Sequence, residues 1–143
     1  MTRIGILGAS GRMGRAIAAL LEEDGEASLA GGCGRGDDVG GLAGGCDVLV
    51  DLSAAGDVAH AAVEHGQEGV ARDDDAGALT GGCDVLVDFS APDALALNLE
   101  AALAADRPIV IGTTGLGPEH QQAIDSAAQR IAVLQAANMS LGV

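Results

Sequence analysis

The sequence predicts an α/β fold, a doubly wound parallel sheet, and two patterns indicate it. Short apolar runs alternate with segments of helical periodicity along the 143 residues. The runs are continuously apolar, which is typical of strands in a parallel sheet that is covered on both faces. At this length the chain is expected to form one domain with a substantial core.

The first elements are a strand over 3–7 and a helix over 12–23, joined by the glycine turn GASGRMG at 8–14. Glycines at this spacing let the backbone turn sharply and approach a pyrophosphate, whose charge then faces the free amides of the new helix. A tight turn without a ligand is the alternative. Strand, turn and helix nevertheless occur in the order that dinucleotide binding requires. A strand over 28–33 and a loop over 34–45 follow.

The central part of the chain contains an internal repeat with an offset of 37 residues, because 35–54 recur as 72–91. Two copies are fewer than a solenoid needs, so we interpret the repeat as a tandem duplication of one βα unit. The elements expected from here to the second copy's helix are strand 47–51, helix 57–65, a candidate strand at 68–71, an acidic loop, strand 84–88 and helix 93–105.

The last expected elements are strand 108–111, helix 118–130 and strand 131–135. Pro92 and Pro118 stand at helix starts, where a missing amide has no energetic cost. In sheets of this kind, ligands bind beyond the carboxyl ends of the strands, at the point where the strand order reverses.

Composition and charge argue against several functions. The net charge of −14 argues against nucleic-acid or anionic-membrane partners, and the absence of lysine excludes a P-loop. No apolar run approaches the roughly twenty residues that span a bilayer, and the first residues lack the features of a signal peptide. The three cysteines, Cys33, Cys46 and Cys83, show no C-x-x-C spacing and are expected to be reduced thiols in a cytoplasmic protein.

The expected strand ends carry the candidate binding residues. Arg35 follows the second strand, where an arginine suits the extra phosphate of NADP and a carboxylate would suit NAD, so NADPH is favoured. A solvated surface arginine is the alternative, and Arg72 is a rival for the same role. Gly112–Gly115 follows the strand at 108–111 and can approach a nicotinamide ring, although an ordinary loop with a helix cap has the same composition.

Four motifs resemble the 4-hydroxy-tetrahydrodipicolinate (dihydrodipicolinate) reductase family of bacterial lysine and diaminopimelate synthesis. The motifs are Gly8–Arg15, Asp84–Ser90, Gly112–Gly115 and Ala136–Val143. The resemblance implies a Rossmann-like cofactor domain for hydride transfer from NADPH or NADH to a cyclic dicarboxylate imine, in an enzyme that usually forms a homotetramer. The chain would be its cofactor-binding half.

The resemblance also implies the individual cofactor-binding residues. Those at the pyrophosphate are Gly8, Ala9, Ser10, Gly11, Arg12 and Met13, and Arg35 meets the adenosine phosphate. Those expected to surround the nicotinamide are Gly112, Thr113, Thr114, Ala136, Ala137, Asn138 and Met139, and Phe89 is a further expected cofactor-binding residue. Thr114 is expected to touch the substrate as well.

Two features depart from the family pattern. Members continue past the segment at 140–143 into a substrate-binding and tetramerising domain, whose histidine-rich motif includes a proton-donating lysine. This chain stops at Val143, so we expect no catalytic residue in it and no turnover by the isolated chain. Its histidines, His60, His65 and His120, match no catalytic position and are expected to be exposed helix residues. His60 and His65 also miss the spacing of a helical metal pair, and no metal is expected.

The second departure is the duplication, because the family pattern needs one copy. Removing 34–70 would restore an ordinary spacing, so this segment is expected to be a tandem-duplicated insert, and Asp84–Ser90 is the copy favoured for the sheet. Two other functional classes stay open. One is a non-enzymatic NAD(P)-binding or redox-sensing module, and the other is a recombined sequence with inherited motifs and no native role.

Overall fold

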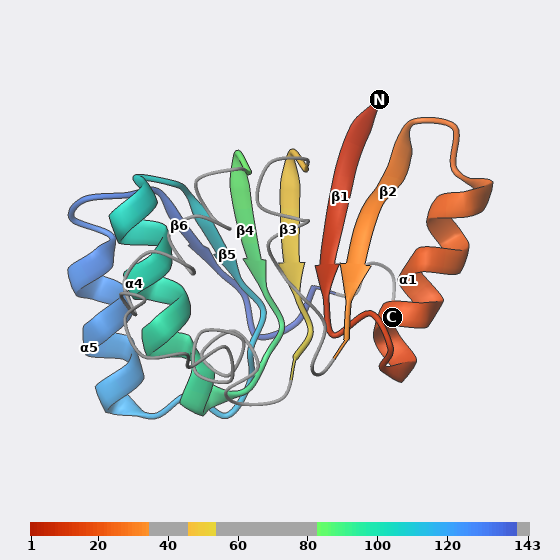
Figure 1. Cartoon of the computed structure of the whole chain (residues 1–143). Helices are drawn as coiled ribbons and strands as arrows, with labels where there is room; N and C mark the ends of the chain where they lie inside the picture. The colour runs from red at the N-terminus through yellow and green to blue at the C-terminus, as the bar shows by residue number, and fades with distance from the viewer. Residues whose placement is uncertain (35–45, 54–82, 140–143) are drawn as a thin grey trace, which may run out of the picture.

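The computed structural model describes residues 1–34, 46–53 and 83–139. The described residues form one parallel sheet of six strands in the order β2-β1-β3-β4-β5-β6 (Figure 1). The strands are β1 (Thr2–Leu7), β2 (Ala27–Cys33), β3 (Val48–Asp51), β4 (Val85–Asp88), β5 (Ile109–Ile111) and β6 (Val133–Gln135). The helices are α1 (Arg12–Glu23), the 3-10 turn η2 (Pro92–Ala94), α4 (Leu95–Ala105) and α5 (Pro118–Ala127). The predicted α/β fold class is confirmed.

The order of the strands defines a switch point between β1 and β3. From β1 the chain passes through α1 to β2 on one side, whereas β4, β5 and β6 follow one another in the opposite direction. Because parallel crossovers are right-handed, α1 covers one face of the sheet, and α4 and α5 cover the other. Figure 1 shows α1 beyond β2 at one end of the molecule, with α4 and α5 together at the other.

Each copy of the repeat contributes one strand to the sheet, and these two strands are neighbours. Strands β3 and β4 pair in parallel with equivalent residues opposite each other, from Val48 with Val85 to Asp51 with Asp88. The favoured copy, Asp84–Ser90, therefore does contribute a strand. The strand predicted at 47–51 is also present, because the apolar run of the first copy pairs with β1 on one side and β4 on the other. Favouring one copy for the sheet was therefore unnecessary, since both copies contribute a strand.

The other predicted elements are present with shifted ends. The helix predicted over 93–105 begins as the turn η2, and Pro92 and Pro118 take the first helical positions as predicted. The helix predicted over 118–130 ends at Ala127, because the next amides donate three residues back and tighten the last turn, that of Gln129 to Ser126 at 3.3 Å and that of Arg130 to Ala127 at 2.9 Å. The predicted helix at 57–65 and candidate strand at 68–71 lie outside the described residues.

The core lies on the face of the sheet that α4 and α5 cover. Buried residues of the strands and of these two helices form one cluster, which includes Leu49, Leu86, Ile109, Leu99 and Ile124. On the opposite face of β3 and β4 the valines are half-buried, so coverage of the two faces is unequal in the described part of the chain. Among these residues, no helix has the length and apolar character needed to cross a membrane.

Candidate functional site

The residues that directly follow the strands form a rim at the carboxyl edge of the sheet. The amide of each donates to the carbonyl of the last residue in the neighbouring strand. These hydrogen bonds join Gly8 to Cys33 (2.8 Å), Leu52 to Leu7 (3.0 Å), Phe89 to Asp51 (2.9 Å), Gly112 to Asp88 (2.8 Å) and Ala136 to Ile111 (3.0 Å). The rim therefore runs in the order Gly8, Leu52, Phe89, Gly112 and Ala136. Ligands of parallel α/β sheets bind at such an edge.

The glycine turn between β1 and α1 requires glycine at two positions. Gly8 has a φ of +80°, in the left-handed region that side chains disfavour. A Cβ on Gly14 would lie 2.5 Å from the carbonyl oxygen of Gly8 and 2.6 Å from the Cα atom of Ala9. Helix α1 therefore begins in close contact with the turn, and a ligand can approach the backbone directly.

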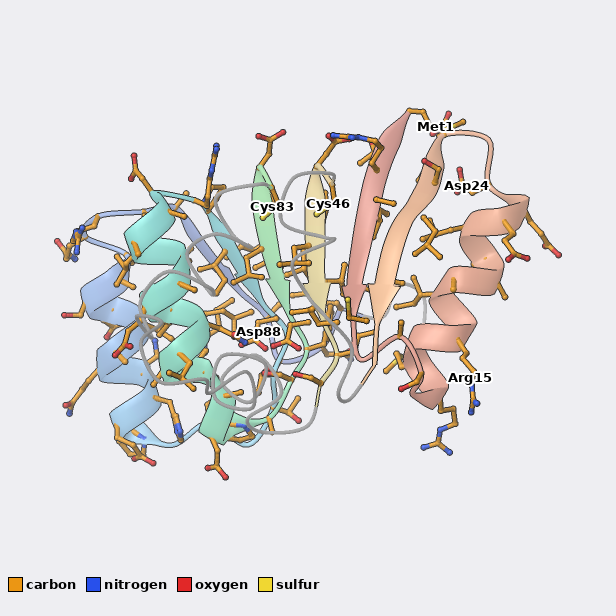
Figure 2. All side chains as sticks on the ribbon, in the orientation of Figure 1. Met1, Arg15, Asp24, Cys46, Cys83 and Asp88 are labelled. Carbon is orange, nitrogen blue, oxygen red and sulfur yellow. The ribbon has the colours of Figure 1, made fainter. Side chains whose placement is uncertain are left out.

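The start of α1 is suited to an anion. Its N-cap is Gly11, and in the described part of the chain no side chain caps its first amides, nor is there an acidic residue in its first turn. Arg12 and Met13 are exposed there. Figure 2 shows Arg15 on α1, on the side of the molecule toward which the carboxyl ends of the strands point. Uncapped amides, the positive end of the helix dipole and two guanidinium groups all favour bound negative charge.

Leu52 and Phe89 hold equivalent positions in the two copies, but Leu52 is the one that adjoins the glycine turn. A Cβ on Gly8 would lie 3.0 Å from the carbonyl carbon and oxygen of Leu52, and 3.1 Å from the amide nitrogen of Ser53. Phe89 follows the next strand along, and its ring covers Gly112, where a Cβ would collide with ring atoms. The predicted site residue Phe89 is therefore separated from the turn by β3.

The loop after β5 is anchored by a buried carboxyl group. Thr113 is buried, and its hydroxyl donates to Oδ1 of Asp88 at 3.0 Å. The same oxygen accepts from the amide of Ser90 at 2.9 Å and from the Ser90 hydroxyl at 2.5 Å. Thr113 thus uses its hydroxyl inside the protein, whereas the neighbouring Thr114 is exposed at the rim.

A second buried carboxyl group, Asp51, lies opposite Asp88 on β3. Its Oδ1 accepts from the amide and hydroxyl of Ser53, at 2.9 and 2.6 Å, and its Oδ2 accepts from Nδ2 of Asn98 at 2.9 Å. Burial raises the pKa of Asp51, and these hydrogen bonds oppose the shift only in part. Oδ2 of Asp88 is buried without a hydrogen-bond partner among the described residues.

The two carboxyl groups position the rim rather than reach a ligand, because both side chains are fully buried. Asn98 of α4 connects them, since its Nδ2 is 2.9 Å from Asp51 and 3.4 Å from the Ser90 hydroxyl. Residues 1–34, 46–53 and 83–139 contain no cluster of three His, Cys, Asp or Glu side chains that could hold a metal ion.

The structure brings most of the predicted site residues to one edge. The glycine turn, the loop that starts at Gly112 and the segment Ala136–Met139 all follow strands at the rim, and Ala137, Asn138 and Met139 are exposed there. Arg35, its rival Arg72, His60 and His65 lie outside the described residues.

His120 lies at the start of α5 and is partly buried, not fully exposed as predicted. Its Nδ1 accepts a hydrogen bond from the amide of Gly117 at 2.9 Å, so it satisfies a helix-start donor. Nδ1 also lies 3.4 Å from Oε1 of Glu119. A ring nitrogen that accepts a hydrogen bond carries no proton, so the contact with Glu119 is not an ion pair in this arrangement.

Leu52, Ser53 and Asn98 belong to the rim and its support, and none of them was predicted as a site residue from the sequence. The repeat carried a signal for the first two, because they are the counterparts of Phe89 and Ser90. Asn98 gave no such signal, because its partner Asp51 is 47 positions away in the chain.

Comparison with known proteins identifies close similarity to one group. A family model described as dihydrodipicolinate reductase, N-terminus, matches residues 2–139. The 4-hydroxy-tetrahydrodipicolinate reductase of Zymomonas mobilis is 37% identical, over 99% of this chain and 43% of its own. The enzymes of that name from Pseudoalteromonas atlantica and Wolinella succinogenes are 34% and 37% identical, over 100% of this chain and 48% and 47% of theirs. The chain thus spans about half the length of the curated relatives it matches.

Proposed function

The chain belongs to the dihydrodipicolinate reductase family, and we propose that it is the cofactor-binding half of a 4-hydroxy-tetrahydrodipicolinate reductase. In this family the N-terminal domain is the Rossmann-type domain that binds NADPH or NADH. The complete enzyme would act in lysine and diaminopimelate biosynthesis as a cytoplasmic homotetramer and reduce a small dicarboxylate substrate.

The observation that carries the proposal is the backbone of the glycine turn. Gly8 adopts a positive φ, Gly14 allows α1 to contact the turn, and Gly11 begins α1 without a side-chain cap among the described residues. A diphosphate fits these residues because its charge needs several converging amides and no side chain in the way. The pyrophosphate would lie on Gly8–Met13.

The remaining cofactor contacts follow from the position of the rim. Gly112–Thr114 and Ala136–Met139 would surround the nicotinamide, with the exposed Thr114 placed to touch the substrate. Arg35 would meet the adenosine phosphate. The bound dinucleotide supplies the hydride, and the residues of this chain bind and orient it.

We further propose that the isolated chain binds the cofactor without turnover. It contains no lysine, and the buried Asp51 and Asp88 cannot deliver a proton to a substrate at the rim. An assay of NADPH oxidation with 4-hydroxy-tetrahydrodipicolinate should show no substrate-dependent rate, and a rate that depends on substrate would refute this part of the proposal.

A titration with NADPH, followed by the fluorescence of the bound reduced nicotinamide, tests the binding site. Two variants of the first residue of α1 separate charge from backbone. Arg12→Ala removes the guanidinium and keeps the amide, whereas Arg12→Pro also removes the amide. Proline suits this position because it is the first of the helix and follows Gly11, whose φ of −71° and ψ of 169° are the extended values that proline requires of its predecessor.

The expected result is that the unaltered chain binds NADPH and that Arg12→Pro binds at least about tenfold more weakly than Arg12→Ala, the loss of one charge-assisted hydrogen bond. Thermal unfolding of both variants checks that the fold is retained. Absence of binding by the unaltered chain, or equal affinities of the two variants, would contradict a pyrophosphate held by these amides.

A further inference from the structure

The extra strand changes which residues stand at the switch point of the sheet. Strand order reverses between β1 and β3, and dinucleotides bind across the edge at such a reversal. With the adenosine half on the β2 side of the glycine turn, the nicotinamide half extends over the strand on the opposite side of β1. That strand is β3, the first copy of the repeat.

The hydrogen bonds of the rim place Leu52 at this point. Its amide donates to the carbonyl of Leu7 at 3.0 Å, so it adjoins the end of β1 directly. Gly8 is so close to it that a Cβ there would lie 3.0 Å from the Leu52 carbonyl carbon. Leu52 is half-buried, so part of this residue is accessible to solvent.

Phe89 is one strand further from the turn. Its amide donates to the carbonyl of Asp51, at the end of β3, and its ring covers Gly112 on the far side. Neighbouring strands are roughly 4.8 Å apart, so β3 moves Phe89 by about that distance from the glycine turn. Phe89 is 38% exposed, and it holds the middle position of the rim.

We propose that Leu52, supported by Ser53, forms the apolar surface on which the nicotinamide half of the dinucleotide rests beside the glycine turn, in place of its counterpart Phe89, which the resemblance implies as a cofactor-binding residue. This inference rests on the proposed dinucleotide binding. Ser53 supports Leu52 from within, because its amide and hydroxyl are both tied to Oδ1 of Asp51. The amide of Leu52 is thus bonded to Leu7 and the amide of Ser53 to Asp51, and both of these partners are buried.

The repeat provides a matched pair of variants, Leu52→Ala and Phe89→Ala. Each is titrated with NADPH and with adenosine 2′,5′-bisphosphate, which lacks the nicotinamide half. Leu52→Ala should raise the Kd for NADPH by about tenfold, and Phe89→Ala should raise it by a clearly smaller factor. Binding of the bisphosphate should differ by less than about twofold between the variants, because neither residue adjoins the adenosine half.

The reciprocal exchanges Leu52→Phe and Phe89→Leu guard against loss of folding, since each residue already occurs at the equivalent position. An aromatic ring beside the nicotinamide should shift the emission of bound NADPH in Leu52→Phe, and Phe89→Leu should leave that emission nearer to its original wavelength. A larger effect from position 89 than from 52, in either the affinities or the emission, would overturn the inference and leave dinucleotide binding intact. Failure of the unaltered chain to bind either ligand would refute the proposed function, and this inference with it.

Discussion

The two copies of the repeat share the sequence Cys-Asp-Val-Leu-Val-Asp, at 46–51 and 83–88, but their side chains meet different partners. The carboxyl of Asp51 receives a hydrogen bond from Asn98 on Oδ2, whereas Oδ2 of Asp88 has no partner in the described part of the chain. At the other end of the strands each copy has an ion pair. Oδ1 of Asp47 lies 3.1 Å from Nη2 of Arg3, and Oδ1 of Asp84 lies 3.7 Å from Nη1 of Arg107.

The cysteines at the amino ends of these strands are alike in burial. Figure 2 shows Cys46 and Cys83 on neighbouring strands, at the end of the sheet opposite Asp88. Burial raises the pKa of both thiols, that of Cys83 to about 11. Identical residues therefore specify the same strand, register and burial, while the neighbours of each strand decide the chemistry of its polar groups.

The largest expected effects concern the shared core residues. Leu49 and Leu86 are 2% and 3% exposed, so Leu49→Ala and Leu86→Ala should each lower the free energy of unfolding by about 2–5 kcal/mol. Urea denaturation measures both. A loss below about 0.5 kcal/mol for Leu49→Ala, beside a large loss for Leu86→Ala, would mean that the first copy is not packed in the sheet.

The variant Asn98→Ala should distinguish Asp51 from Asp88 by their effects on stability. It removes the donor to Oδ2 of Asp51, and leaving that buried oxygen unsatisfied should lower the free energy of unfolding by about 1–3 kcal/mol. Double-mutant cycles with Asp51→Ala and with Asp88→Ala give the coupling energies. The coupling of Asn98 with Asp51 should exceed that with Asp88, and the reverse order would contradict the network.

The free energy of unfolding should depend on pH in part through the ionisation of Asp51. Because burial raises its pKa in the folded protein above the ordinary value of 3.8, its contribution to stability is complete below that value and is lost as pH rises through the folded pKa. The loss for one proton is at most about 1.4 kcal/mol per pH unit. Asp51→Asn should remove this part of the profile, so parallel profiles for the two proteins would contradict it.

The smallest expected effect concerns Asp47, at the exposed end of β3. Its pKa is lowered first by the backbone amide of Arg3 and then by the Arg3 side chain. Arg3→Ala keeps the amide, which lies 2.7 Å from Oδ2, so the pKa of Asp47 should rise but stay below its usual range. An NMR pH titration measures it, with Arg107→Ala as the control that leaves Asp47 unchanged. A complete return to the ordinary pKa would assign the shift to the side chain.

Local sequence patterns predicted the elements of this fold because their causes are local. The apolar runs indicated the strands, Pro92 and Pro118 marked helix starts, and glycines 8, 11 and 14 marked the turn into α1. The failures concern contacts between distant segments. A repeated βα unit is compatible with a looped-out copy or an added strand, and pairing with β1 decides between them. The Asn98–Asp51 hydrogen bond likewise depends on how α4 lies on the sheet.

The first copy of the repeat forms a strand of the sheet at the switch point, beside the glycine turn. Native-state hydrogen exchange at the amides of Leu49 and Val50, compared with those of Leu86 and Val87, checks this claim. Both pairs lie in interior strands and should exchange slowly, with similar protection. Rapid exchange at Leu49 and Val50, beside slow exchange at Leu86 and Val87, would contradict the claim.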